Sequence, residues 1–410
     1  MKQLLLTLLM LVMCGLRAQT LSDMVLRDDV KTVQLYTGGA EREFPVLTLD
    51  GDGRMVLEFD VLRAQPEALH WHFVHCDRHW AADGLDPVEF INGFVEGTID
   101  DYDFSFTTLV DYVHYRAVLP EGFASFTHSG NYVVEVTDDH GQPLLRRRFC
   151  VNEQTVKVEA DITRPYDNVD IDRRQEVDVK LTAQRPEFGD PQYLEVIVQQ
   201  NGRLDNRRSL SFSGYDGSAL AWRHRQENIF HGGNNFRFFD CSNLRTPMYN
   251  VMRVEEYGGE TFAILRPDED RSRRHYLSET TLNGGMKVNI WDRNNPRLEA
   301  DYVWVNFSLP MSQPLLDGSV YVVGALTDWR LDSVSRMDYN PQYRAYTKRL
   351  LLKQGYYAYL LLVDGAAWPA NRSRTAPLEG DHRETPNSYT VFVYYRSPAD
   401  RADRLIAVWR

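Results

Sequence analysis

The stretch Met55-Val-Leu-Glu-Phe-Asp-Val-Leu62 alternates apolar and acidic residues with a period of two. In an extended chain, successive side chains point to opposite faces. The apolar face carries Met55, Leu57, Phe59 and Val61, and the acidic face carries Glu58 and Asp60. Such alternation is typical of a β-strand with one face on a core and the other towards water. The stretch therefore predicts a half-buried strand.

The same period runs through most of the chain. "EVDVKLTA" (176–183) places Val177, Val179 and Leu181 against Asp178 and Lys180. Further runs of this kind are 155–162, 193–200, 301–309, 319–326 and 389–395, and turn signals such as Asp52-Gly53 and Asn201-Gly202 lie between such runs. Many short strands, frequent turns and little helical periodicity favour antiparallel sheets packed face to face. We predict an all-β protein of three consecutive immunoglobulin-like, early-set β-sandwich domains.

Length, proline and charge divide the chain. A chain of 410 residues is too long for one core and suits about three domains. The strand ending "RRRFCVNE" closes a first unit, and the charged "RPDEDRSRRH" and "WDRNNPRLEAD" regions close a second. The predicted divisions are a signal peptide at 1–18 and domains at 19–153, 154–297 (with a charged connector) and 298–410.

The first twenty residues, "MKQLLLTLLMLVMCGLRAQT", resemble a secretory signal peptide. The apolar run Leu4–Met13 is about half of the roughly 20 residues that a membrane-spanning helix needs. We expect cleavage after Ala18 and export of the mature chain. The alternative is a lipoprotein signal with Cys14 as the lipidated residue, but Met13 suits that cleavage poorly. No later segment is long and apolar enough to predict a transmembrane helix.

Charge and cysteine content narrow the classes of partner. The formal net charge is -12, and loss of Lys2 and Arg17 with the signal makes it more negative. An acidic surface disfavours nucleic acid, whose binding needs Lys and Arg to displace counterions. Three cysteines remain after export: Cys76, Cys150 and Cys241. At most one disulfide can form within the chain, and Cys76 with Cys150 is the pair that shares a predicted domain.

The stretch "HWHFVHCDRHW" (70–80) has the residue types of a metal or thiol site. The candidate ligands are His70, His72, Cys76 and His79. The alternative is a core strand with Trp71 and Phe73 buried, followed by a loop from Cys76 to Trp80. We favour the strand, because no second ligand cluster is evident and Asp77 opposes formation of a Cys76 thiolate. No nucleophile elbow, metalloprotease or phosphate-binding motif is present, so the sequence predicts no catalytic residue, no cofactor and no enzyme.

The third predicted domain carries a more specific pattern. Its matching positions are Gly324, Asp328, Trp329, Gly355, Tyr356, Asp364, Gly365 and Trp368. The pattern resembles early-set immunoglobulin-like domains that include glycogen-binding modules. That resemblance implies Trp329 and Trp368 as residues that could stack on sugar rings. The alternative is that both tryptophans pack within the sandwich or its loops, since such a motif identifies a fold more securely than a ligand.

Taken together, many segments resemble the plug protein family of the type IX secretion system. They include "VKTVQLYTGG", "FPVLTLDGDGRMVLEFD", "FVHCDRHW", "SGNYVVEV", "VQQNGRLDN", "GGNNFRFFD", "LEADYVWVNFSLP", "GALTDW", "LLLKQGYYAYLLLVD" and "YTVFVYYRSPADRADRLI". The chain departs from the pattern at His70 and His72, where we expect aromatic residues.

This resemblance implies a non-catalytic, monomeric periplasmic plug. Its partner is the outer-membrane translocon barrel, which it seals from the inner side when no cargo is engaged. Translocon contact residues are not assigned. One alternative is a periplasmic or surface glucan-binding protein that acts through the third domain. Another is exported cargo, although "DRLIAVWR" has little likeness to a sorting signal.

Overall fold

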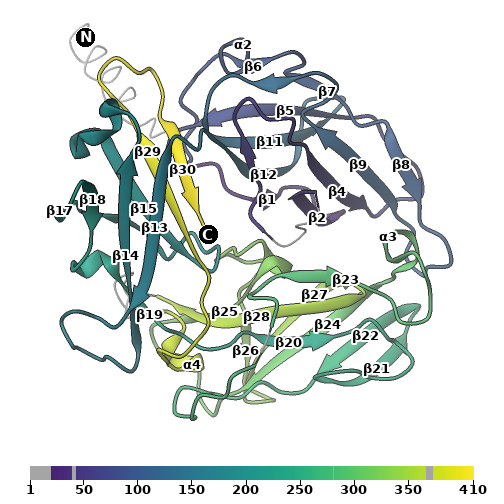
Figure 1. Ribbon diagram of the computed structural model, residues 1–410. Helices are drawn as coiled ribbons and strands as arrows, with labels where there is room; N and C mark the ends of the chain where they lie inside the picture. The colour runs from purple at the N-terminus through teal and green to yellow at the C-terminus, as the bar shows by residue number, and fades with distance from the viewer. Residues whose placement is uncertain (1–19, 39–42, 280, 366–372) are drawn as a thin grey trace, which may run out of the picture.

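A computed structural model describes residues 20–38, 43–279, 281–365 and 373–410. The predicted signal peptide with Cys14, and Trp368 of the predicted sugar-binding pair, lie outside these ranges. Within them, no helix has the length and apolar character needed to cross a membrane. The regular secondary structure of the described chain is almost entirely β-strand, which confirms the predicted all-β fold class (Figure 1).

The first sandwich packs two antiparallel sheets over one core. One sheet contains β1 (Met24–Val25), β12 (Pro143–Asn152), β11 (Gly130–Asp138), β5 (Leu69–Cys76) and β7 (Glu96–Thr98), with β3 (Val46–Thr48) parallel to β12. The facing sheet contains β2 (Val30–Thr37), β4 (Met55–Val61), β9 (Val113–Leu119) and β8 (Asp101–Phe104). A small ribbon pairs β6 (Ile91–Asn92) with β10 (Ser125–Phe126).

The second sandwich is formed by segments from two distant parts of the chain. Its first sheet contains β13 (Val156–Thr163), β14 (Arg174–Ala183), β18 (Ala219–Trp222) and β17 (Gly214–Asp216), with β19 (Ile229–His231) also on β14. Its second sheet contains β16 (Arg207–Leu210), β15 (Leu194–Gln200), β29 (Tyr389–Tyr395) and β30 (Arg404–Trp409).

The third sandwich lies between β19 and β29 in the sequence. One sheet contains β21 (Val251–Tyr257), β22 (Glu260–Leu265), β24 (Tyr302–Pro310), β27 (Ala345–Lys353) and β26 (Asp338–Asn340). The other contains β20 (Arg237–Asp240), β28 (Gly355–Asp364) and β23 (Met286–Val288), with β25 (Ser319–Val323) also on β28. The β22–β24 pair is parallel.

Helices in the described chain are single turns. The α-helical turns are α2 (Pro87–Phe90), α3 (Pro296–Glu299) and α4 (Ala376–Glu379). The 3₁₀ turns are η1 (Pro186–Gly189), η2 (Pro191–Tyr193), η3 (Gln226–Asn228) and η4 (Ala325–Thr327). Each α-helical turn has proline at its start, where the missing N–H removes no helical hydrogen bond.

The sheets group the strands differently from the boundaries predicted from the sequence. The predicted boundary at 153/154 lies in the linker between β12 and β13, but the boundary at 297/298 falls inside the third sandwich. The last two strands leave that sandwich, and β29 pairs with β15 of the second sandwich, as its yellow ribbon shows in Figure 1. Local periodicity identifies a strand but not its partner, so this long-range pairing had no sequence signal.

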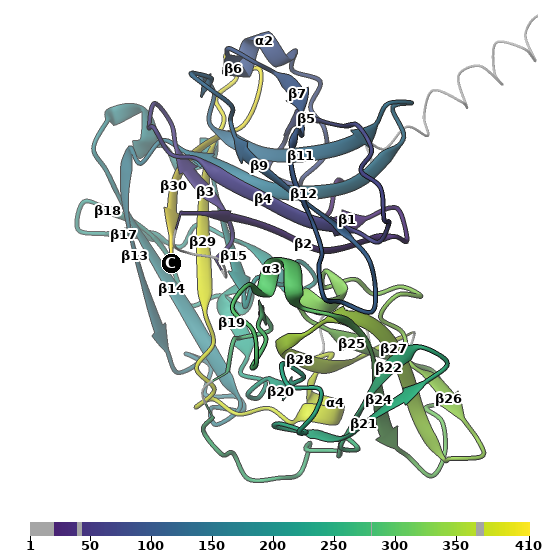
Figure 2. The same ribbon diagram turned by 90° about the vertical axis from the view of Figure 1, so that its right-hand side faces the viewer.

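Strand β4, which contains the alternating stretch from Met55 to Val61, is buried on both faces. Its apolar face contributes Met55, Leu57, Phe59 and Val61 to the first core, as predicted. Its acidic face was expected to meet water, but Glu58 is 5% exposed and Asp60 is 1% exposed. The third sandwich covers this face (Figure 2). The expectation of a half-buried strand is therefore wrong for β4.

The cysteines do not form the bridge considered for Cys76 and Cys150. Both are free and buried, as is Cys241. Asn131 of β11 pairs with Cys76 on one side and with Cys150 on the other. Two strand spacings, about 9.5 Å, therefore separate the two cysteines. A disulfide needs Cα atoms no more than about 7 Å apart.

Candidate functional site: the seams between the sandwiches

The histidine-rich stretch forms β5 of the first sandwich and the loop after it. Trp71 and Phe73 are buried in the first core, as expected for a core strand. His75 shares their face, and its Nδ1 lies 2.6 Å from a carboxylate oxygen of Asp83. The stretch is thus a strand with an internal polar pair.

The four metal candidates are not brought together. His70 and His72 lie on the outer face of the sheet beside separate carboxylates, Asp139 at 2.7 Å and Glu135 at 3.5 Å. Burial raises the pKa of the Cys76 thiol to about 12, which opposes both metal binding and nucleophilic attack. Among the described residues, no cluster of three potential ligand atoms within 4.8 Å contains any of the four.

The loop after β5 instead forms the seam between the first and second sandwiches. Cys76 and Trp80 pack in one apolar cluster with Phe392 and Tyr394 of β29. The Arg148 guanidinium lies 4.9 Å from the centre of the Trp80 ring, a favourable cation–π distance. The "FVHCDRHW" motif is therefore used for docking one sandwich on another.

Polar groups from the same motif fix the register of this first–second seam. Arg78 pairs with Glu195 of β15 at 2.8 Å, and its backbone N–H donates to Asp403 at 2.8 Å. Across the seam, the Tyr394 hydroxyl donates to the Asn131 side-chain oxygen at 2.8 Å. These directional contacts favour this placement of the two sandwiches, because any other would separate buried polar groups such as Asn131 from their partners.

The first–third seam is built around the carboxylate of Asp60 on β4. The Lys353 ammonium, at the end of β27, donates to it at 2.6 Å. The Tyr302 hydroxyl donates to the same oxygen at 2.6 Å, and His114 Nδ1 lies 2.7 Å from the other oxygen. Lys353 also donates to the Arg297 carbonyl at 2.6 Å. Two charges and a tyrosine thus meet in a buried contact between the sandwiches.

The electrostatics of this cluster favour the charged carboxylate. Burial alone would raise the pKa of Asp60, but the attraction of Lys353 and the contact with His114 hold that pKa below its ordinary value. Burial lowers the pKa of Lys353, although Asp60 opposes this shift. The side chains of Asp60 and Lys353 are each 1% exposed. Removing either partner would leave the other charge buried without its ion-pair partner.

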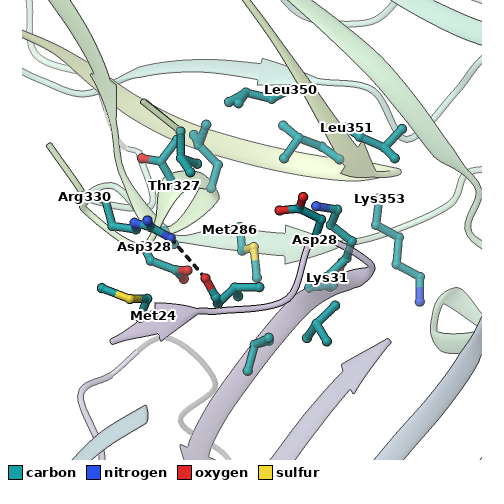
Figure 3. A pocket seen from close by; sticks show the side chains of 18 of the residues that line it. Met24, Asp28, Lys31, Met286, Thr327, Asp328, Arg330, Leu350, Leu351 and Lys353 are labelled. Atoms are coloured by element: carbon teal, nitrogen blue, oxygen red, sulfur yellow. Dashed lines mark hydrogen bonds between the residues drawn. The ribbon is translucent and has the colours of Figure 1, made fainter. Parts of the chain in front are cut away.

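A cleft of about 390 Å³ lies on the same seam (Figure 3). Lys31 of β2 and Lys353 of β27 lie along its walls, which mix charged side chains with apolar ones such as Met286 and Leu351. At one end, Arg147 of β12 pairs with Asp328 at 2.8 Å, and Arg330 donates to the Val25 carbonyl at 3.1 Å. Burial raises the pKa of Asp328, and Arg147 opposes that rise. Loops of the third sandwich therefore close one end of the cleft.

The predicted sugar-binding pattern is largely structural where it is described. Trp329 is half-buried, and its indole packs edge-to-face on Phe236 at 6.0 Å. A Cβ atom on Gly284 would lie 2.3 Å from the same indole, so the ring rests directly on this glycine. Asp328 takes part in the first–third seam. Trp329 therefore has neighbours on more than one side of its ring.

The remaining positions of this pattern belong to tight backbone packing in the third sandwich. A Cβ on Gly324 would lie 2.7 Å from the Ala358 carbonyl oxygen, and one on Gly365 would lie 2.2 Å from that of Asp317. Gly355 approaches the Lys287 carbonyl equally closely. Tyr356 stacks on Phe238 at 5.4 Å. Asp364 pairs with Arg374 at 3.3 Å.

The second–third seam lies where the chain crosses between these sandwiches. His231 Nδ1 lies 2.6 Å from Asp381, and the Asn387 amide donates to the Gly232 carbonyl at 2.7 Å. A Cβ on Gly232 would lie 2.1 Å from the His382 carbonyl oxygen, so no side chain fits there. Gln200 of the "VQQNGRLDN" segment lies beside this crossing, and its side-chain amide donates to the His231 carbonyl at 2.8 Å.

The sequence did not identify the residues that form the buried polar contacts of the first–third seam. Asp60 was assigned to a solvent-facing side, and Lys353 and Tyr302 were not singled out. One signal was available for Lys353, which interrupts a long apolar run in "LLLKQGYYAYLLLV". A lysine in a run that predicts a buried strand needs a buried acid or a path to water. Its partner could not be chosen from the sequence.

One comparison with solved structures covers the whole fold. A crystal structure of a hypothetical protein from Parabacteroides merdae ATCC 43184 matches with a TM-score of 0.90 at 31% identity, over 95% of this chain and 99% of that chain. Two other structures have a TM-score of 0.16, which carries no argument about fold. They are Pseudomonas fluorescens alkylpurine DNA glycosylase AlkC bound to DNA containing an abasic site analog (14% identity, 30% of each chain) and the BSP domain of a biofilm associated protein (8% identity, 96% of this chain and 97% of that chain). Among curated proteins, none matches.

Fold and seams together define the class: an all-β protein whose three sandwiches are joined by buried polar contacts. The family follows from the first sandwich. The model of the type 9 secretion system plug protein 1st domain matches residues 30–153, which run from β2 to the end of the first sandwich. The chain belongs to the type IX secretion system plug protein family.

Proposed function

We propose that this protein is a periplasmic plug that seals the inner side of the type IX outer-membrane translocon when no cargo is engaged. It acts by shape and binds the translocon barrel as a monomer within that complex. Sealing the pore in this way needs neither a cofactor nor a catalysed reaction. Family membership supports the link to the secretion system. Sealing the pore is the additional step that we propose.

The observation that carries the proposal is the joining of the three sandwiches by buried charge and hydrogen bonds. A body that blocks a wide opening must resist bending, and domain motion is the default unless the interface is extensive. The Asp60–Lys353 pair, the Asn131–Tyr394 hydrogen bond and the close packing at Gly232 each restrict one seam. The three seams restrain three sandwiches in a closed arrangement (Figure 1). We infer that they move as one body.

The decisive experiment is deletion of the gene followed by measurement of outer-membrane permeability. We expect entry of large, normally excluded molecules to rise, and to return to the wild-type level when the gene is restored. Complementation with Lys353→Met tests the buried first–third seam. Complementation with Lys157→Met, which changes an exposed lysine, is its matched control. Unchanged permeability in the deletion strain would refute the proposal. Co-purification with a very large outer-membrane barrel would independently support the proposed partner.

A further inference from the structure

The second sandwich contains a cluster of metal-ligating side chains that none of its family motifs includes. Glu176 and Asp178 lie two residues apart on β14 and point to the face away from the core residue Val177. His224 comes from the loop after β18. One ligand atom from each of the three residues lies within 4.8 Å of the others.

In the part of the chain that the structure describes, neither carboxylate forms an ion pair with a lysine or an arginine. The Glu176 side chain is fully buried, and it pairs with His224, whose Nδ1 lies 3.0 Å from a carboxylate oxygen. Oδ1 of Asp178 is buried and has no hydrogen-bond partner. Lys180 and Arg223, the nearby basic residues in the sequence, both pair with Asp216 instead. Two adjacent negative charges in such a setting need a proton or a metal ion between them.

The neighbouring strand adds to this excess of negative charge. Asp161 of β13 lies directly opposite Asp178 across the antiparallel pair. Residues directly opposite share a face of the sheet, and like charges there are destabilising. Burial and the charge of Glu176 raise the pKa of Asp178 to about 6. Glu176, Asp178 and Asp161 thus gather on one face of the sheet, where a bound cation would relieve the repulsion between their carboxylates.

We propose that Glu176, Asp178 and His224 form a binding site for a divalent transition-metal ion, with zinc as the best fit. Zinc accepts mixed carboxylate and imidazole ligands, often three from the protein and one water. Calcium prefers oxygen alone, so the imidazole favours zinc. Ligands of a tetrahedral zinc ion lie roughly 3.4 Å apart, so small side-chain rotations suffice.

Part of the site is already held in position. The Glu176 carboxylate accepts backbone N–H groups from Tyr166 at 2.6 Å and from His224 at 2.9 Å. These bonds tie the β13–β14 loop and the loop after β18 to the same carboxylate. His224 Nδ1 lies 3.0 Å from a Glu176 carboxylate oxygen, so both atoms could contact one ion. Bound metal would therefore pin both loops to the sheet.

The test uses the mature chain, stripped with a chelator and titrated with zinc in a calorimeter. We expect one zinc ion per chain and an increase in melting temperature on loading. Asp178→Asn and His224→Ala should each weaken binding at least tenfold and remove most of the temperature shift. Glu176 is left intact because its hydrogen bonds serve the fold. His70→Ala, which removes a histidine beside one exposed carboxylate, is the matched control and should bind zinc like wild type.

Each outcome decides the proposal. Loss of binding in the two site variants, with retention in the control and with unchanged circular dichroism, supports it. No binding by wild type, or equal binding by all variants, refutes it and leaves a carboxyl–carboxylate pair that shares one proton. Loss of binding only in His70→Ala would move the metal to the first sandwich and refute this site. None of these outcomes depends on the plug function.

Discussion

Substitution of Lys353 by methionine tests whether a buried ion pair holds the first and third sandwiches together. The variant keeps most of the side-chain volume but leaves the Asp60 carboxylate, 1% exposed, without its ammonium partner. Removing one member of a buried pair costs about 3–5 kcal/mol, mainly because the other charge remains desolvated. The Arg297 carbonyl also loses its donor at 2.6 Å. We expect the free energy of unfolding to fall by about this amount.

The assay is equilibrium unfolding in urea, followed by tryptophan fluorescence and circular dichroism. Asp60→Asn and the double variant complete a thermodynamic cycle. Because the double variant leaves no isolated charge, its loss should be smaller than the sum of the single losses by about 1–3 kcal/mol. Lys157→Met is the matched control, since the Lys157–Glu159 pair is exposed on both sides. It should unfold like wild type.

Two results would refute the reasoning about this seam. The first is a loss below about 1 kcal/mol in Lys353→Met, which would place the ion pair in a solvated setting. The second is strict additivity in the cycle, which would mean that Asp60 and Lys353 act independently. A loss equal to that of Lys157→Met would have the same meaning. In each case the Asp60–Lys353 pair would not be what holds the first and third sandwiches together.

Three further predictions follow from packing and titration. The fold lowers the pKa values of four carboxyl groups: Asp23, Asp60, Asp205 and Glu379. The ionised carboxylates therefore stabilise the folded state at pH values above their unfolded-state pKa of about 4. This stabilisation is lost as the pH falls through the lower folded-state pKa values. Unfolding titrations should therefore show stability falling in acid, with a shallower slope in Asp60→Asn, and an equal slope would contradict this role. Gly232→Ala should lower the free energy of unfolding by about 1–3 kcal/mol or more, because its Cβ meets a carbonyl oxygen at 2.1 Å. Gly189→Ala is the control, because a Cβ there would meet open space, and it should leave the free energy of unfolding unchanged. If both variants lost the same free energy of unfolding, the steric explanation would be wrong. Ellman's reagent should modify no cysteine in the native mature chain and three in urea, since burial raises the thiol pKa values to about 12, and rapid native labelling would contradict the burial.

The sequence predicted local structure well because the relevant physics is local. A period of two identified which side of β5 and β14 would be buried, and Trp71, Phe73, Val177 and Val179 lie in cores as expected. The apolar face of β4 was predicted for the same reason. The placement of Trp329 was left open between a ligand site and packing, and the structure shows it packed on Gly284 and Phe236.

The sequence could not predict which strands pair over long distances. Residues 389–395 show a clear strand pattern, but their partner is β15, nearly two hundred residues earlier. The domain division predicted from charge did not anticipate that β29 and β30 return to the second sandwich. It placed a boundary in the charged stretch 291–301, which is a connector inside the third sandwich. Strand partners are chosen by complementary faces in three dimensions, which a one-dimensional pattern does not contain.

The same limit explains why acidic positions on predicted strands were the hardest to interpret. An acidic residue that alternates with apolar residues is expected to face solvent. Asp60 and Asp178 both depart from this expectation, and they differ in what compensates their charge. Asp60 is covered by the third sandwich and neutralised by Lys353. One oxygen of Asp178 is buried without a hydrogen-bond partner. In the first case the compensating cation comes from another sandwich, and in the second we infer that it comes from solution. The buried carboxylate of β4 therefore marks a contact between two sandwiches, and we propose that those of β14 mark a metal ion.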